Sequence, residues 1–286
     1  MKNFFRVVGV LSLLLFGFFC TEKTATVMKE MDDVMIQIKE VKNHYQEKPE
    51  EAVLIKNGLI PGITGREVDV NKSYLSMKRV GHFDESLLEY RDVFPKIRFE
   101  KNYRNYIIGG NPKKNMVSFI FLVDKNTTEK ELQTLLQILR IKKVKANFFI
   151  DGNWFEENND LVNTIVLEGH DLGNLSYNLD YNDSSFIWMD TIIKKLTKKK
   201  FSYCYGEKEN ALALDTCAMY KNYTIRPSLK IDASPYITIK QNIKAGTIAS
   251  FPIQQTVIQE LPSIITFTEE KGYKITTLPT HLNEKK

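Results

Sequence analysis

From residue 111 onward, short apolar runs alternate with longer segments whose apolar residues recur at helical spacing. The predicted strands are residues 117–123, 146–150, 171–175, 201–204, 224–231, 247–251 and 273–276. The predicted helices between them are residues 129–141, 159–167, 185–198, 207–219 and 254–271. Strands that alternate with helices predict a parallel sheet, because each helix returns the chain to the same end of the sheet. About seven such units predict an α/β fold, an incomplete barrel related to the eightfold β/α barrel.

The length and charge of the chain set bounds on its organisation and partners. Its 286 residues, 43% of them hydrophobic, suffice for one full-sized α/β core with a lead-in region. Forty Lys and Arg against 35 Asp and Glu give a net charge of +5, with both signs mixed along the chain. The lysines at 194–200 are expected to be a solvated helix end rather than a contact for anionic polymer or lipid. Nucleic acid is disfavoured as a partner, because no basic stripe with interleaved aromatic residues is present.

The first 20 residues have the pattern of an export signal or a short membrane anchor. A basic start is followed by an uncharged apolar run over residues 7–20 that ends at Cys20. This run is shorter than the ~20 residues that cross a bilayer. An uncleaved anchor, a lipoprotein signal with a lipidated Cys20, and simple cleavage are three alternatives; Phe19 favours the anchor, because lipoprotein processing requires a small residue there. All three predict a location outside the cytoplasm, and we expect a membrane-anchored protein of the bacterial cell envelope.

Residues 21–48 are predicted to form a helical stalk. Its apolar residues follow one another at spacings of 4, 3, 4, 3 and 4, the a and d positions of a heptad pattern. These residues are Val27, Met31, Val34, Ile38, Val41 and Tyr45. Three heptads are marginal for an autonomous coiled coil. Two interpretations therefore stay open: the stripe pairs two copies into a weak homodimer, or it packs on the domain that follows it.

Cys204 and Cys217 are the cysteines of the predicted barrel. Export would permit a disulfide between them. However, a helix over residues 207–219 that directly follows the strand would place Cys217 about 15 Å from Cys204. The Cα atoms of a disulfide lie roughly 6 Å apart. Two separate buried thiols are therefore expected.

Two blocks of the predicted barrel carry a distinctive order of residues. Residues 146–150 read Ala-Asn-Phe-Phe-Ile, and residues 168–174 read Glu-Gly-His-Asp-Leu-Gly-Asn. Together they resemble the polysaccharide deacetylase family, or NodB homology domain, and the resemblance covers about residues 115–282. It implies the deformed (β/α) barrel of that family. The expected organisation is an anchor over 1–20, a helical stalk over 21–48, a small α+β lead-in over 49–110 and the barrel over 111–286.

The resemblance places the catalytic positions of the family on apolar residues. The family motif Thr-Phe-Asp-Asp-Gly supplies a base and a metal ligand, whereas residues 121–125 read Phe-Leu-Val-Asp-Lys. The family motif can be aligned with this stretch in two ways that differ by one residue. In one, Asp124 replaces the metal-binding Asp and the base position is Val123. In the other, Asp124 replaces the Gly and the base position is Leu122. The two metal-binding histidines of the family are replaced by Leu175 and Leu179.

Two further family positions have also changed. The position of the general acid histidine falls on Pro252. The substrate-contacting motif Arg-Pro-Pro-Tyr-Gly keeps only Tyr205 and Gly206. With a base, an acid and two imidazoles missing, no metal or other cofactor is predicted, and the protein is expected to be a pseudoenzyme. Asp124, Tyr205 and Gly206 are candidate substrate-binding residues.

Other polar residues of the barrel have simpler interpretations. His170 is expected to be a structural histidine, because one imidazole alone does not make a metal site. Asp124 and Asp232 are expected to cap or turn the chain. Asp180, Asn182 and Asp183 are expected to form a solvated turn. No phosphate loop, nucleophile elbow, Cys-x-x-Cys or His-Glu-x-x-His motif is present.

The function expected from the sequence is a membrane-tethered, catalytically inactive protein that binds an envelope glycan or a protein partner. One alternative is a divergent carbohydrate N-deacetylase, acting on peptidoglycan or a chitin-type polymer, that uses Asp124 with unrecognised ligands. A second is a structural spacer, in which the stalk and residues 49–110 carry the interaction.

Overall fold

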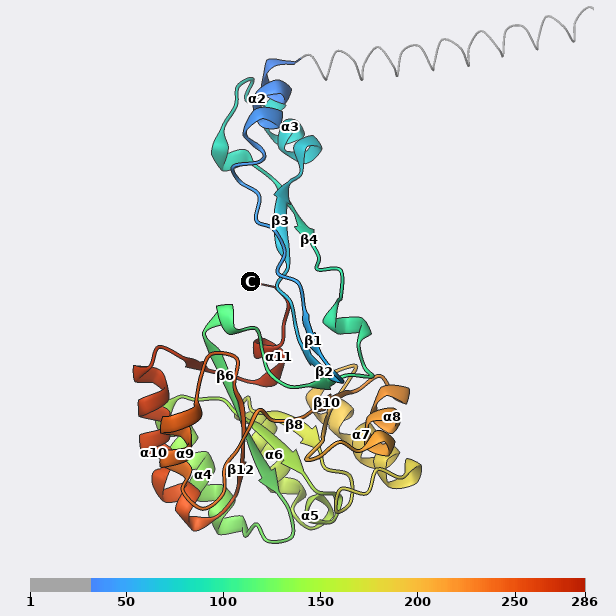
Figure 1. The fold of residues 1–286 in the computed structure, drawn as a ribbon, viewed down its shortest axis with the longest axis vertical. Coiled ribbons are helices and arrows are strands. Elements are labelled where there is room, and N and C mark those ends of the chain that lie inside the picture. The colour runs from blue at the N-terminus through green and yellow to red at the C-terminus, as the bar shows by residue number, and fades with distance from the viewer. Residues whose placement is uncertain (1–31, 286) are drawn as a thin grey trace, which may run out of the picture. The chain divides into compact units, whose positions relative to one another are not determined.

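A computed structural model describes residues 32–285 as two compact units (Figure 1). The smaller unit comprises residues 32–49 and 64–94, and the larger comprises residues 50–63 and 95–285. The predicted anchor at 1–20, Cys20, Val27 and Met31 lie outside the described residues. Within residues 32–285, no helix is both long and apolar enough to cross a membrane.

The smaller unit contains two helices, α2 (Asp33–Val41) and α3 (Val70–Lys78), and a two-stranded antiparallel sheet of β3 (Gly65–Val68) and β4 (Tyr90–Val93). Val34 and Ile38 of the predicted stripe are buried together with Tyr74 and Met77 of α3. Burial against α3 removes these two side chains from a helix pair between copies. Packing on the chain that follows therefore accounts for this part of the stripe, and dimerisation stays a prediction.

The larger unit is built on one long sheet, in which every neighbouring pair except β1 and β2 is parallel. Its order is β1 (Val53–Ile55), β2 (Gly58–Ile60), β5 (Tyr106–Ile107), β10 (Tyr223–Ile225), β9 (Tyr203–Tyr205), β8 (Asp171–Asn174), β7 (Asn147–Ile150), β6 (Met116–Val123), β12 (Ile248–Pro252) and β11 (Leu229–Lys230). A short strand, β13 (Lys274–Ile275), also pairs with β6. The sheet curls into a half-barrel, which confirms the predicted fold class.

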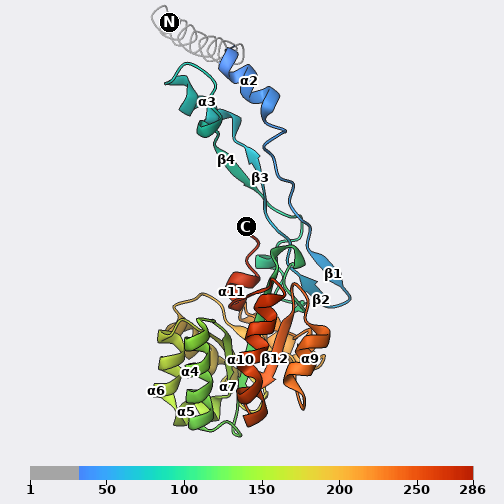
Figure 2. The ribbon, with the colours of Figure 1, turned by 90° about the vertical axis from the view of Figure 1, so that its left-hand side faces the viewer.

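Eight helices of the described chain belong to this unit. They are α4 (Glu129–Lys142), α5 (Gly152–Glu157), α6 (Asn159–Leu167), α7 (Asp183–Thr197), α8 (Ala211–Met219), α9 (Pro235–Asn242), α10 (Gln255–Glu270) and α11 (Leu278–His281). Figure 2 shows α4, α6 and α10 flanking the sheet. The predicted strand at 224–231 is instead two strands on either side of Pro227: β10 pairs with β5 and β9, whereas β11 pairs with β12.

The core has two sides because alternate residues of a strand point to opposite faces of the sheet. On β6, Phe119 and Phe121 pack outward among the helices, whereas Ile120 lies in the inner cluster with Phe149 and Tyr203. Residues 50–63 and 95–110 belong to the same compact unit as the barrel, since β2 and β5 extend its sheet. The compact units therefore divide differently from the predicted boundaries at 48 and 110.

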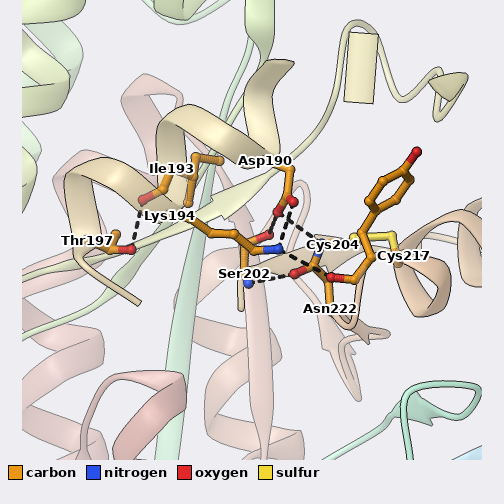
Figure 3. Close-up of polar contacts among 9 residues, drawn as sticks. Asp190, Ile193, Lys194, Thr197, Ser202, Cys204, Cys217 and Asn222 are labelled. Atoms are coloured by element: carbon orange, nitrogen blue, oxygen red, sulfur yellow. Dashed lines mark hydrogen bonds and ion pairs between the residues drawn. A yellow bond between two sulfur atoms is a disulfide. The ribbon is translucent and has the colours of Figure 1, made fainter. Parts of the chain in front are cut away.

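Cys204 and Cys217 form a disulfide, with Cα atoms 6.5 Å apart (Figure 3). The prediction of two separate thiols is wrong. It assumed that the helix starts at residue 207, but α8 starts at Ala211, and Asn210 caps it by accepting a hydrogen bond from Ala213 N. Residues 206–210 first extend beyond the strand, so the helix returns Cys217 beside Cys204.

Removing this disulfide is expected to lower the free energy of unfolding by about 3 kcal/mol, the value for a closed loop of this length. The double replacement Cys204→Ala with Cys217→Ala, followed by urea unfolding, measures this loss. A reducing agent should destabilise the native chain to a similar extent and leave the double variant unchanged. Equal stability of native and variant chains would contradict the bond.

A buried polar network lies next to the disulfide and joins α7 to β9 and to the chain that precedes β10 (Figure 3). The Asp190 carboxylate, 5% exposed, accepts hydrogen bonds from Ser202 Oγ at 2.8 Å and Asn222 Nδ2 at 2.9 Å. It also accepts one from Lys194 Nζ at 2.8 Å, while Asn222 Oδ1 accepts one from Ser202 N. Asp190 therefore has a compensating charge and satisfied lone pairs inside the fold.

Candidate functional site

The carboxyl ends of β6 and β12 bring the predicted base and acid positions together. Leu122 and Pro252 are direct register partners on these strands, and both are partly buried. Leu122 packs on the inner cluster, whereas Val123 is fully buried in the outer cluster among the helices. Of the two alternatives for the base position, Leu122 is therefore the one that faces the barrel interior. Neither Leu nor Pro has a side-chain group that transfers a proton.

The two leucines at the predicted imidazole positions lie in the loop after β8. Leu175 is 5% exposed and packs in the inner cluster, and Leu179 is 39% exposed. The backbone φ angles of Ser176, Asn178 and Leu179 are +54°, +51° and +61°, so this loop is a compact left-handed turn.

Asp151 holds the loop in place and was not identified from the sequence. Its carboxylate, 3% exposed, accepts a hydrogen bond from Asn153 N at 3.0 Å as the cap of α5 and another from Asn178 N at 2.6 Å. The signal for the first bond is visible in the sequence, because Asp before Gly-Asn-Trp is a typical helix cap. The second bond depends on the tertiary fold. Asp151 therefore has a positioning role in this loop.

The carboxylates near the site are used in local turns. Asp124 Oδ1 accepts a hydrogen bond from Asn126 N at 2.9 Å, and the exposed Asp232 accepts one from Ala233 N at 2.6 Å. The carboxylate of Asp180 accepts hydrogen bonds from the backbone N and side-chain Nδ2 of Asn182. The contacts of Asp124 and Asp180 are those of Asx turns, and the contact of Asp232 is with the residue that follows it.

Tyr205 and Gly206 form part of the barrel wall. Tyr205 is 4% exposed, and its hydroxyl donates to Ser250 Oγ at 3.2 Å. Burial raises the pKa of the Tyr205 hydroxyl, which therefore stays protonated at neutral pH. A Cβ at Gly206 would lie 3.1 Å from Tyr106 and 3.2 Å from Thr224, so the strand end packs closely there.

The residues at the family's metal position do not fit a divalent ion. Leu175 and Leu179 offer no donor atom, and the Asp124 carboxylate is engaged in a backbone turn. Across residues 32–285, no group of three or more His, Cys, Asp or Glu side chains is arranged to hold a metal.

An exposed aromatic side chain, Trp188 of α7, lies beside the loop after β8 and is 39% exposed. The Trp188 ring lies 5.7 Å from the Phe155 ring and 6.0 Å from the Tyr177 ring. These neighbours orient Trp188 while leaving part of its ring accessible, which provides an exposed aromatic face beside this loop.

His170 is a buried structural histidine. Its Nδ1 accepts a hydrogen bond from Ala146 N at 3.1 Å, and its ring packs edge-on to Phe148 at 5.2 Å. Burial, together with the nearby charge of Lys145, lowers the pKa of His170 from 6.5 to about 4. His281, buried beside Ser118, also has its pKa lowered to about 4, mainly by burial.

These pKa values predict that the protein loses stability in acid. Between pH 6.5 and about 4 an unfolded histidine binds a proton that the folded one does not, so stability is present above pH 6.5 and falls as pH decreases. Each histidine contributes up to about 3 kcal/mol to this loss. His170→Asn should reduce the acid dependence of urea unfolding by about half, whereas the exposed control His44→Asn should not. An unchanged acid dependence in His170→Asn would contradict this assignment.

Parts of this chain are similar in sequence to a known protein family and to a known bacterial protein. The polysaccharide deacetylase family matches residues 109–214. The uncharacterised protein YlxY of Bacillus subtilis is 35% identical over 176 residues, which are 61% of this chain and 54% of YlxY. This chain therefore spans about half the length of that relative.

Solved structures extend the comparison to most of the chain. BA3943, a CE4 family pseudoenzyme from Bacillus anthracis, matches with a TM-score of 0.67 and 26% identity, covering 90% of this chain and 97% of that chain. A mutant of BA3943 with restored enzymatic activity matches with the same TM-score of 0.67 and 26% identity, over 89% of this chain and 100% of that chain.

Proposed function

Residues 109–214 form a degenerate polysaccharide deacetylase domain, and on this premise we propose that the protein is a non-catalytic, membrane-tethered, extracytoplasmic glycan-binding protein. The observation that carries the proposal is that apolar residues occupy the metal-ligand, base and acid positions at the carboxyl ends of the half-barrel strands. Leu175 and Leu179 stand at the metal-ligand positions, and Leu122 and Pro252 lie side by side on adjacent strands at the base and acid positions. Aliphatic groups there cannot polarise an amide or transfer its protons.

The likeness to BA3943 supports the same interpretation, since that protein is described as a pseudoenzyme of family CE4. The tether is proposed from the basic and apolar pattern of residues 1–20. We infer that the protein binds the polymer of a deacetylase without converting it. The exposed indole of Trp188 offers such a contact, because pyranose rings present apolar C–H faces that stack on indole rings.

Glycan binding is tested with Trp188→Ala. Removing the indole is expected to weaken binding to peptidoglycan fragments or chitin oligomers about tenfold, the equivalent of about 1.4 kcal/mol. The control is Leu167→Ala, which truncates an apolar side chain that is 86% exposed on α6. Thermal unfolding of both variants identifies any loss of folded protein.

Two results would contradict the proposal. One is the absence of saturable binding of either polymer by the native chain, which would favour a protein partner instead. The other is equal affinity of native, Trp188→Ala and Leu167→Ala proteins, which would place the glycan on another surface.

A further inference from the structure

A second concave site lies at the seam of the half-barrel, within the larger unit. This seam pocket has a volume of about 600 Å³, within the usual range for small-molecule sites. It is bounded by the β1 and β2 hairpin, the chain after β5, the link between β10 and β11, and the turn before β12. Its lining residues are Ile55, Ile60, Ile108, Gly109, Gly110, Pro112, Arg226, Pro227, Ser228, Lys244, Ala245, Gly246 and Thr247.

One part of the seam pocket is aliphatic. Ile55 and Ile60 lie on the same face of the hairpin, because their register partners are Gly58 and Val53, and Ile108 packs against them beside Gly58. Ile55 is 52% exposed, an unusual position for a β-branched apolar residue in a three-residue strand. A bound apolar group would remove this surface from water.

The charged groups of the seam pocket are all cationic. Lys244 and Arg226 line it, and no carboxylate does. The Arg226 guanidinium is held 5.1 Å from the Tyr106 ring and 3.0 Å from Glu209, which lies outside the lining. Lys244 has no ion pair within residues 32–285, so its charge is uncompensated there.

Thr247 adds a buried donor to these cations. Its side-chain oxygen accepts a hydrogen bond from Lys244 N at 3.1 Å, and the residue is 3% exposed. Its own hydroxyl hydrogen has no acceptor among the described residues, so it can donate into the seam pocket. Cations and a hydroxyl donor together select an anion.

We infer that the seam pocket binds a small aliphatic carboxylate, with its chain on the three isoleucines and its carboxylate on Lys244, Arg226 and Thr247. A sugar fits poorly, because the lining has no aromatic ring for stacking and no amide or carboxylate to bridge hydroxyls. The site is therefore distinct from the glycan surface around Trp188. A carboxylate attached to an aliphatic group occurs both in a fatty acid and at the C-terminus of a peptide with aliphatic side chains.

Calorimetric titration of the full-length chain tests this inference with three probes. Octanoate represents a fatty acid, acetyl-Leu-Ile with a free carboxylate represents a peptide terminus, and 1-octanol is the uncharged control. At least one carboxylate should bind with one-to-one stoichiometry and at least tenfold more tightly than octanol, since a charge-assisted hydrogen bond contributes about 1.5–3 kcal/mol. The carboxylate that binds more tightly identifies the source of the ligand.

Three variants separate the seam pocket from the rest of the surface. Lys244→Ala should weaken carboxylate binding about tenfold, whereas Lys240→Ala, an exposed lysine of α9 outside the lining, should leave it unchanged. Trp188→Ala should also leave it unchanged, which distinguishes this site from the proposed glycan surface. Binding of octanol as tight as that of octanoate, equal effects of the two lysine variants, or no saturable binding of either carboxylate would overturn the inference.

Discussion

Replacing Asp190 with alanine is expected to lower the free energy of unfolding by about 3–5 kcal/mol, the range for removing one partner of a buried ion pair. The Asp190 carboxylate is 5% exposed and receives hydrogen bonds from Lys194, Ser202 and Asn222. Its removal leaves Ser202 Oγ and Asn222 Nδ2 without this acceptor, and it leaves the Lys194 charge, which also donates to Tyr220 O, without its counter-ion. Since these donors belong to three separate segments, the loss should affect the whole side of the half-barrel around β9.

Urea unfolding of matched variants measures this effect. Asp215→Ala removes an aspartate with a 60% exposed side chain, whose carboxylate lies 3.8 Å from Arg104. This control should change stability by less than about 1 kcal/mol, as surface ion pairs do. Asp190→Asn keeps the shape of the side chain and one acceptor oxygen, so its loss of unfolding free energy should lie between those of Asp190→Ala and Asp215→Ala. A loss in Asp190→Ala no larger than in Asp215→Ala would show that the network contributes little.

The double replacement Leu175→His with Leu179→His is expected to create a metal site without creating an enzyme. Two imidazoles at this spacing would give two of the three protein ligands found in catalytic zinc sites, and Asp124 would become the third by releasing the turn contact with Asn126 N. Residue 179 has φ +61°, a conformation that histidine adopts more readily than leucine. The variant should bind zinc with one-to-one stoichiometry in a competition titration, and the native chain should not.

Turnover should still be absent from this variant. Leu122 and Pro252 remain at the base and acid positions, and each proton-transfer group is typically worth about 10²–10⁴ in rate. The control is Leu175→Asn with Leu179→Asn, which adds polarity at both positions without imidazole. Zinc binding by the Asn variant would assign the metal to other residues, and acetate release by the His variant would show that another group supplies the base.

The central strands were predictable because their apolar runs are continuous. Strands β6 and β7 begin and end within one residue of the predictions, since buried parallel strands are apolar on both faces. Strand β8 also does, although its sequence Asp-Leu-Gly-Asn is not an apolar run. The helices α5, α9 and α11 were missed because they are short, at 6, 8 and 4 residues, and carry little periodicity. Pro227 was a visible signal against one continuous strand over 224–231.

The site shows a different limit of sequence analysis. The missing catalytic groups at Leu122, Leu175 and Pro252 were read from motif spacing, and the register of β6 and β12 brings two of these positions together. The second contact of Asp151, with Asn178 N, joins residues 27 positions apart and depends on the fold. The prediction about the two cysteines fails because the cap at Asn210 sets the start of α8 at Ala211 and not at residue 207. The cap at Asn210 is a local signal that the sequence contains, whereas the contact between Asp151 and Asn178 depends on the tertiary fold.

The most direct test of the account combines metal analysis of the purified native chain with an acetate-release assay on chitin oligomers and peptidoglycan. Aliphatic side chains at Leu122, Leu175, Leu179 and Pro252 predict sub-stoichiometric metal and no acetate release above the buffer blank, with or without added zinc. Stoichiometric metal together with acetate release that is lost in Asp124→Asn would contradict the account and establish a divergent deacetylase.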